Sequence, residues 1–499
     1  MSISLSKRGR PRYEAQASSG ERTAETLEAL VIETGERDLR AAVIGPAGER
    51  QSLMASIINA KHRAVSRGGP GAVMGSKNLK ADVVRGTQKI PMLNPEKVKK
   101  LNAAVLDYMK NGPTAEQVKL WFTYGTGGTL AGVGVTGDAP VKNWGGAGAM
   151  DMGEERLTKI ATFTYDSKYK VRKYACAQCP LGCGAHYKVD DGKWPVGQTD
   201  RPEYETLAAF GTMTLNDDAE SIIKCNDIWN RYGLDTISVG ASIAWAIECY
   251  EKNVLTQKET GGIRLTWGNG EAIVAATQAI ADRAGFGKIL ALGSVRAAQI
   301  LGIGTEYLQT VQGIELPMHD PRFPPMFSKT YKCDPTPAPY VKGGLGIPDF
   351  GSPDEVKYTY EGRGEMDLAF TCYSEVMSSD VACMFGIGFC VPEGTLEAII
   401  EAVTGWNVDM VQTGKRIMTM RHLFSLREGK KRVDNVLPGR CVGEPPLAGG
   451  PLKGITVDHE KLADNFFDAA GWDKESLVPT RKSLHDLGGM EDVIRDFYP

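Results

Sequence analysis

The feature that most constrains this chain is a group of three cysteines within eight residues, in the stretch YACAQCPLGCGAH at positions 174–186. Cys176, Cys179 and Cys183 follow a C-x2-C-x3-C spacing, which lets three thiolates converge on one inorganic centre. The proline after Cys179 stiffens the turn, and the glycines on both sides of Cys183 let the backbone wrap closely. This spacing is typical of three ligands of a [4Fe–4S] cluster whose fourth ligand is remote in sequence.

Two other interpretations fit the same cysteines. Zinc sites usually show two paired knuckles, whereas this stretch has one triple and only His186 close by. Free thiols are the third interpretation, and the spacing favours iron–sulfur over both. Scattered cysteines are mostly small, buried hydrophobic residues. Seven further cysteines are scattered in this way: Cys225, Cys249, Cys333, Cys372, Cys383, Cys390 and Cys441.

Length and charge narrow the class of protein. The 499 residues correspond to about two to four domains at roughly 150 residues each. A net charge of -3 without a long basic run argues against a nucleic-acid partner. No apolar run approaches the ~20 residues that span a bilayer, and the polar N-terminus lacks the apolar core of a signal peptide. We therefore expect a cytoplasmic protein with no membrane span, whose reduced cysteines serve metals or redox chemistry.

The chain divides by its hydrophobic pattern. Residues 1–22 are polar and read as a disordered leader. A helical period over 23–34, a strand ending at Gly45-Pro46, a helix over 50–63 and a strand over 81–86 follow. Residues 92–310 are mostly helical, residues 311–350 are irregular and rich in Pro and Gly, and helical patterns then return. Long irregular segments of that composition are often functional.

A glycine-rich loop lies between residues 66 and 86. Its five glycines would let backbone amides approach a phosphate or another anion. The spacings G-x-G-x-x-G and G-x-x-x-x-G-K-[ST] are both absent. A turn that leads into a strand explains the loop equally well.

Several separate stretches occur in one order: IGPAGE, RGGPGAVMGSKNLKA, CAQCPLGC, RPEYETLAAFG, RYGLDTIS, HDPR and FSLREG…DNVLPGR. Together they closely resemble the aldehyde:ferredoxin oxidoreductase family of tungsten-pterin enzymes, from about residue 22 to residue 499. The resemblance implies a mostly α, multi-domain fold. Its parts would be a remnant of the β-rich N-terminal pterin-binding domain (23–91), a helical domain with the cysteine triad (92–310) and a C-terminal helical domain (311–499).

The resemblance also implies the cofactors. The family binds tungsten, or molybdenum, between two pterins, with a [4Fe–4S] cluster beside one of them. Cys176, Cys179 and Cys183 would ligate the cluster. The fourth ligand would be Cys383, at the end of SSDVAC, with Phe385 two residues later as in the family. Cys372 and Cys390 are competing candidates in less well-matched context.

The pterin and substrate residues follow by the same resemblance. NRYGLD matches a pterin-binding signature at Asn230, Gly233, Leu234 and Asp235, although such a stretch alone is usually a turn between helices. The glycine-rich loop would hold pterin phosphate with Arg67, Gly69, Gly71 and Ala72. In the family a glutamate from RPEYETLAAFG handles protons beside the metal, so Glu203 and Glu205 are both candidates. Ordinary carboxylates at a helix start are the alternative.

Three departures from the family pattern matter. Tyr340 stands in CDPTPAPY where a histidine is expected, and a tyrosine can donate a hydrogen bond but is a poor base at neutral pH. His319, in HDPR, is interpreted as structural. Ser378 replaces an aspartate in the motif before Cys383. Residues 1–22 do not resemble the family's leading segment, so we expect that segment to be missing.

The predicted function is oxidation of a small aldehyde to a carboxylic acid, with Glu203, Glu205 and Tyr340 as catalytic candidates. Electrons would pass through the cluster to ferredoxin or an iron–sulfur subunit, and a homodimer is compatible with this organisation. Two alternatives remain open. One is a tungsten reductase of the aryl-CoA type, and the other is a truncated, non-catalytic iron–sulfur paralogue.

Overall fold

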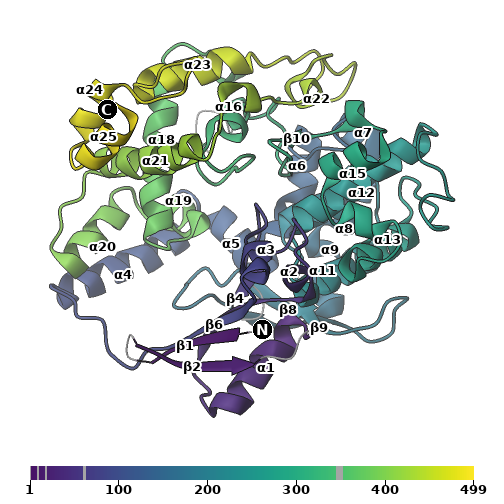
Figure 1. The fold of residues 1–499 in the computed structure, drawn as a ribbon, viewed down its shortest axis with the longest axis horizontal. Helices are drawn as coiled ribbons and strands as arrows, with labels where there is room; N and C mark the ends of the chain where they lie inside the picture. The colour runs from purple at the N-terminus through teal and green to yellow at the C-terminus, as the bar shows by residue number, and fades with distance from the viewer. Residues whose placement is uncertain (1, 8–9, 17–19, 60–62, 344–351, 499) are drawn as a thin grey trace.

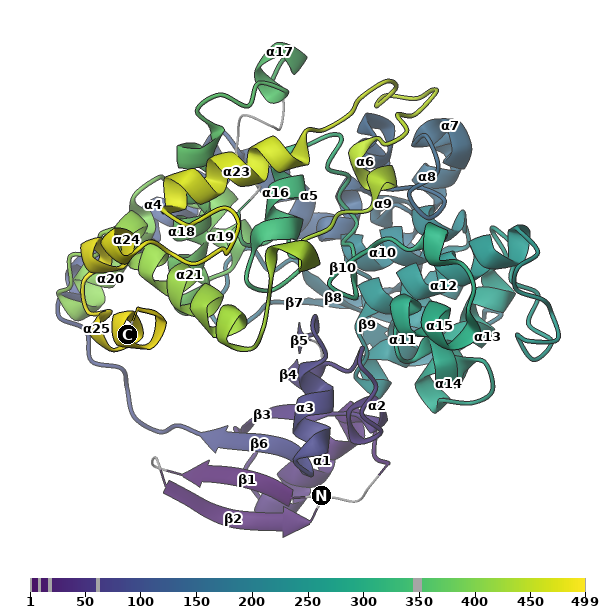
Figure 2. The ribbon, with the colours of Figure 1, turned by 45° about the horizontal axis from the view of Figure 1, so that its top comes forward.

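The computed structural model describes residues 2–7, 10–16, 20–59, 63–343 and 352–498. A small β-rich N-terminal part lies against the helical middle of the chain, and the C-terminal helices form a second helical part (Figures 1 and 2). The mostly α, multi-domain architecture predicted from the sequence is confirmed. None of the helices in these ranges combines the length and the apolar character that a bilayer crossing needs.

The N-terminal part is a six-stranded sheet in the order β2-β1-β6-β3-β4-β5. Its strands are β1 (Ser2–Lys7), β2 (Arg10–Gln16), β3 (Arg40–Ile44), β4 (Ile57–Asn59), β5 (Arg63–Val65) and β6 (Leu79–Arg85). Strand β1 runs parallel to β6, and every other neighbouring pair is antiparallel. Helix α1 (Thr23–Thr34) covers one face, because Leu30 packs into the apolar core formed by β3, β4 and β6.

Two local predictions in this region are wrong. Residues 1–22 were expected to be disordered, but β1 and β2 form in this segment and extend the sheet beyond β6. The helix expected over 50–63 is also absent from the described part of that range, residues 50–59 and 63. Helix α2 (Pro46–Glu49) ends early, and Ile58 enters β4 opposite Val43 with no exposed surface. Pairing with β3 provides the buried side chain with a better environment than a solvent-facing helix would.

The middle of the chain forms a helical layer around α12 (Thr236–Glu251). This helix is buried on nearly all sides, since every residue from Thr236 to Cys249 is buried. It packs against α10 (Tyr204–Phe210) and α13 (Gly270–Asp282), and α10 and α13 also pack against α11 (Ala219–Tyr232). A small sheet of β7 (Lys170–Tyr174), β8 (Gly184–Val189) and β9 (Val196–Asp200) borders this layer.

The C-terminal part is a second helical layer. Helix α18 (Arg363–Ser379) packs on α21 (Met410–Arg427) and α23 (His459–Ala470). Helix α16 (Met326–Cys333) joins α23 from the stretch that was expected to be irregular. The shorter α19 (Met384–Phe389) and α20 (Thr395–Thr404) lie on the side of α4 (Pro95–Asn111) and α5 (Ala115–Tyr124), as Figure 1 shows.

Candidate active site

The three clustered cysteines lie in one hairpin loop. Strands β7 and β8 are antiparallel with Tyr174 opposite Gly184, so residues 175–183 form the connection between them. Left-handed backbone at Gln178 (φ 56°) and Gly182 (φ 53°) tightens the loop. Because the two strands fix both ends, the three thiols are held within one short turn.

The C-terminal layer brings Cys383 to this loop. Cys383 caps the N-terminus of α19, and Trp121 of α5 packs edge-on against Phe385 of that helix, with ring centroids 4.7 Å apart. Burial, the Glu203 charge and the nearby thiols of Cys383 and Cys176 together raise the pKa of the Cys183 thiol to about 12, against the opposing effect of Arg63. Cys383 therefore lies near Cys183 and Cys176 of the hairpin loop.

Cys390 lies at the other end of α19 and is buried. Burial raises its pKa to about 11, with smaller contributions from Cys179 and Cys383. Cys372, the other competitor, is enclosed in the core between α18 and α21, where its backbone contacts Gly414.

Within the described ranges, no three His, Cys, Asp or Glu side chains are arranged to hold a single metal ion. Four thiols of two distant segments fit the donor set of a [4Fe–4S] cluster.

The two predicted pterin segments meet through the backbone between β3 and β4. The Ser56 amide donates to the Gly233 carbonyl (2.8 Å), and the Asp235 amide donates to the Met54 carbonyl (2.8 Å). On the other side, a Cβ at Gly71 would lie 2.6 Å from the Ser56 carbonyl oxygen. Only glycine permits this approach, so the glycine-rich loop and the GLD turn are packed against the same short segment.

Side chains at this junction have polar atoms that the protein leaves unsatisfied. Asn230 and Ser56 are buried, and neither side chain has a hydrogen-bond partner among the described residues. Arg67 lies 3.5 Å from Asp235 and also donates to the carbonyls of Glu315 and Ala338, while its Nε has no partner in the described ranges. Buried polar groups normally find partners. Amide, hydroxyl and guanidinium groups match the N–H, carbonyl and phosphate groups of a pterin, so these residues fit that cofactor.

The two candidate glutamates point to different places. Glu205 is mostly buried: its Oε2 accepts from the Met318 amide (2.9 Å), and its Oε1 lies 3.6 Å from His319 Nε2. Burial raises the pKa of Glu205, against the opposing effect of His319. Glu203 instead pairs with Arg63 (3.0 Å) and accepts from Thr126 (2.5 Å). Since Glu203 also raises the pKa of Cys183, it lies on the side of the cysteine loop.

Tyr340 lies beside Glu205 and His319. Its ring centroid is 5.0 Å from that of His319, and burial and the Glu205 charge raise its pKa well above 10. His319, interpreted from the sequence as structural, in fact bridges Asp138 Oδ2 (2.9 Å) and Glu205. No sequence signal indicated Asp138, which is 181 residues away.

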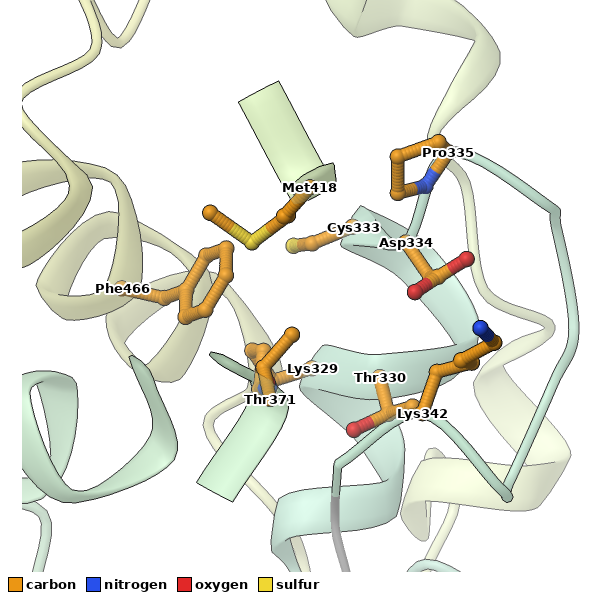
Figure 3. A pocket seen from close by; sticks show the side chains of 9 residues that line it. All are labelled: Lys329, Thr330, Cys333, Asp334, Pro335, Lys342, Thr371, Met418 and Phe466. Atoms are coloured by element: carbon orange, nitrogen blue, oxygen red, sulfur yellow. The ribbon is translucent and has the colours of Figure 1, made fainter. Parts of the chain in front are cut away.

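The loop that carries Tyr340 is held from the C-terminal layer. Arg421 of α21 donates to Thr336 (2.7 Å), lies 3.2 Å from Asp334 and pairs with the buried Glu375 of α18. Behind the loop is a cavity of about 10 Å³, close to the size of one water, which Lys329, Asp334, Lys342 and other side chains line (Figure 3). Arg67 also contacts the same loop, through the Ala338 carbonyl.

Comparison with known proteins identifies the family of this chain. A family model described as aldehyde ferredoxin oxidoreductase, domains 2 and 3, matches residues 100–488, and the model for the N-terminal domain matches residues 3–86. The chain belongs to this family of oxidoreductases. The match at residues 3–86 corrects the expectation that the family's N-terminal segment is missing.

Individual relatives are similar over most of the chain. It is 33% identical to a tungsten-containing aldehyde ferredoxin oxidoreductase of Pyrococcus furiosus, over 96% of this chain and 77% of that protein. The chain is also 30% identical to an aliphatic sulfonate oxidoreductase, WOR-like subunit, of the same organism. That match covers 89% of this chain and 69% of the relative. The active-site complex BamBC of benzoyl coenzyme A reductase, solved with 1,5-dienoyl-CoA, superposes with a TM-score of 0.76. The superposition covers all of this chain and 81% of the solved chain, and the two sequences are 22% identical. The two proteins therefore share a fold.

Proposed function

We propose that this protein oxidises an aldehyde to a carboxylic acid at a tungsten (or molybdenum) bis-pterin centre and passes the electrons through a [4Fe–4S] cluster to ferredoxin or an iron–sulfur subunit. The observation that carries the proposal is the position of Glu205, whose side chain is mostly buried. It lies beside Tyr340 on one side of the pterin junction, while the four cysteines lie on the side of Glu203. We infer a cytoplasmic location, which ten free cysteines support.

Each group of residues has a distinct part. Cys176, Cys179, Cys183 and Cys383 would hold the cluster, and Asn230, Gly233, Leu234 and Asp235 with Arg67, Gly69, Gly71 and Ala72 would hold the pterins. When bound, the metal centre supplies the two-electron chemistry. The protein contributes proton handling, because oxidation of RCHO with water to RCOOH releases two electrons and two protons. Glu205 can take up a proton, and Tyr340 can donate a hydrogen bond to the substrate oxygen.

Elemental analysis of the protein purified without oxygen tests the proposal, combined with reduction of benzyl viologen by a panel of aldehydes. We expect about four irons and one tungsten or molybdenum per chain, with aldehyde-dependent activity. Glu205→Gln should keep the metals and lower kcat by about 10²–10⁴-fold. Iron without tungsten or molybdenum would refute the pterin assignment.

A second candidate is reduction of an aryl-CoA thioester. This reaction is favoured by Tyr340, which stands where the aldehyde-oxidising family has a histidine. The raised pKa of Tyr340 keeps its hydroxyl protonated. Assaying the same preparation with aromatic CoA thioesters and a low-potential donor separates the two. The non-catalytic alternative loses its main premise, because the N-terminal domain is matched.

A further inference from the structure

Asp138 is a buried carboxylate with one histidine partner. It follows α6 (Leu130–Thr136), is 1% exposed, and its Oδ2 lies 2.9 Å from His319 Nδ1. The backbone keeps the two residues together, since the Asp320 amide donates to the Asp138 carbonyl (2.7 Å). The second carboxylate oxygen, Oδ1, has no partner among the described residues.

Aromatic side chains fix the plane of the His319 ring. Tyr204, Tyr340 and Phe327 surround it, with ring centroids at 4.8, 5.0 and 5.4 Å. The Tyr331 hydroxyl donates to the His319 carbonyl (2.6 Å). With the ring held and Nδ1 turned toward Asp138, Nε2 must point toward Glu205, 3.6 Å away.

We propose that Asp138 is a positioning residue that holds His319 with its Nε2 toward Glu205, so that Glu205 and His319 together take up the protons released at the active site. The proposal rests on the function proposed above. A carboxylate on Nδ1 keeps that nitrogen protonated and stabilises the imidazolium when Nε2 also takes a proton. A proton accepted by Glu205 can then move to His319, which leaves Glu205 ionised for the next turnover.

The surrounding charges support a proton held between these residues. Burial disfavours a charged His319, but Asp138 and then Glu205 outweigh it and raise its pKa above the usual 6.5. Glu205 also faces Arg67 and Asp235. Tyr204, Tyr331 and Tyr340 are kept neutral by burial, and Asp320 is paired with Arg322. Asp138 and Glu205 are therefore the carboxylates that act on the imidazole.

The first test measures stability and does not depend on turnover. A histidine whose pKa is raised by folding stabilises the native state below its unfolded pKa of about 6.5, and this contribution is lost as pH rises through the folded pKa. The Tm advantage of wild type over Asp138→Asn should therefore be largest near pH 5 and shrink toward pH 8. In a His319→Gln background, Asp138→Asn should add no pH dependence. A Tm difference that is the same at every pH would show only a structural contact and would overturn the proposal.

The second test follows the pH profile of aldehyde oxidation with benzyl viologen. Asp138→Asn should lower kcat on the order of tenfold or more and shift the acidic limb of the profile, while Asp138→Glu restores part of both. Asp282→Asn, which removes a carboxylate bonded to Tyr232, serves as the control and should change neither. If wild type oxidises no aldehyde, the proposed function fails, but the Tm series still decides the role of Asp138. An active Asp138→Asn variant with an unshifted profile would refute it.

Discussion

Arg67 and Asp235 are 168 residues apart in the chain, and their side chains lie 3.5 Å apart at the junction of the two predicted pterin segments. Asp235 also caps α12, since it accepts from the amides of Ile237 and Ser238. The Asp235 carboxylate thus contacts the Arg67 guanidinium and also caps the N-terminus of α12.

The Arg67–Asp235 pair should be needed for the pterin centre and not for the cluster. Arg67→Gln removes the positive charge that would face pterin phosphate, so tungsten or molybdenum content should fall several-fold while iron stays constant. Metal analysis of wild type and variant, grown and purified together, checks this. Full tungsten or molybdenum content in the variant would contradict the assignment.

Cys383 and Cys390 should differ in their effect on iron. Cys383→Ser removes a predicted ligand at the N-terminus of α19, so iron and sulfide per chain should drop and the visible absorbance of the cluster should weaken. Cys390→Ser changes a buried neighbour on the same helix and should leave the iron content near that of wild type. The reverse pattern would transfer the fourth-ligand assignment to Cys390.

Arg421 should stabilise the Tyr340 loop strongly. Arg421→Ala leaves the buried carboxylates of Asp334 and Glu375 without this partner, which costs about 3–5 kcal/mol of unfolding free energy for a buried network. Arg495→Ala removes an exposed pair with Asp492 and should cost less than ~1 kcal/mol. Urea unfolding of both variants provides the comparison. Equal, small losses would mean that the loop does not depend on this network.

Two glycine substitutions should have opposite signs. Gly71→Ala places a methyl group 2.6 Å from the Ser56 carbonyl oxygen, so it should destabilise the protein by about 1–3 kcal/mol through overpacking. Gly132→Ala lies in α6 with open space around the new methyl, so it should stabilise by about 0.5–1 kcal/mol. Denaturation midpoints of the two variants measure the difference.

The sequence predicted the parts of the site whose residue type is dictated by local geometry. Gly71 and Gly233 were identified in a motif, and the structure places both against the Ser56 backbone, where a larger residue at Gly71 would clash. Cys176, Cys179 and Cys183 were singled out by their spacing, whereas Cys383 was proposed from the family resemblance, and the role of all four as ligands stays a prediction. The helical character of the region that holds α11 and α12 was also predicted, because both helices are long.

The remaining features depend on contacts between distant segments. Ile58 sits in a stretch with helical character, and pairing with β3 and β5 makes it a strand residue. Nothing local distinguishes Glu205 from Glu203, because the choice depends on Met318 and His319 from another part of the fold. His319 was interpreted as structural for the same reason: Asp138, its partner, is brought to it by the tertiary structure.

The cysteine hairpin has a consequence for how the molecule is assembled. Three of the four predicted ligands belong to the middle of the chain, and the fourth, Cys383, follows Cys183 by 200 residues. An iron–sulfur cluster bound there would be a covalent tie between the two helical layers, closing a very long loop and removing entropy from the unfolded chain. Oxidative loss of the cluster would then do more than interrupt electron flow. It would release α19 from the hairpin and loosen the layer that holds Tyr340 in place.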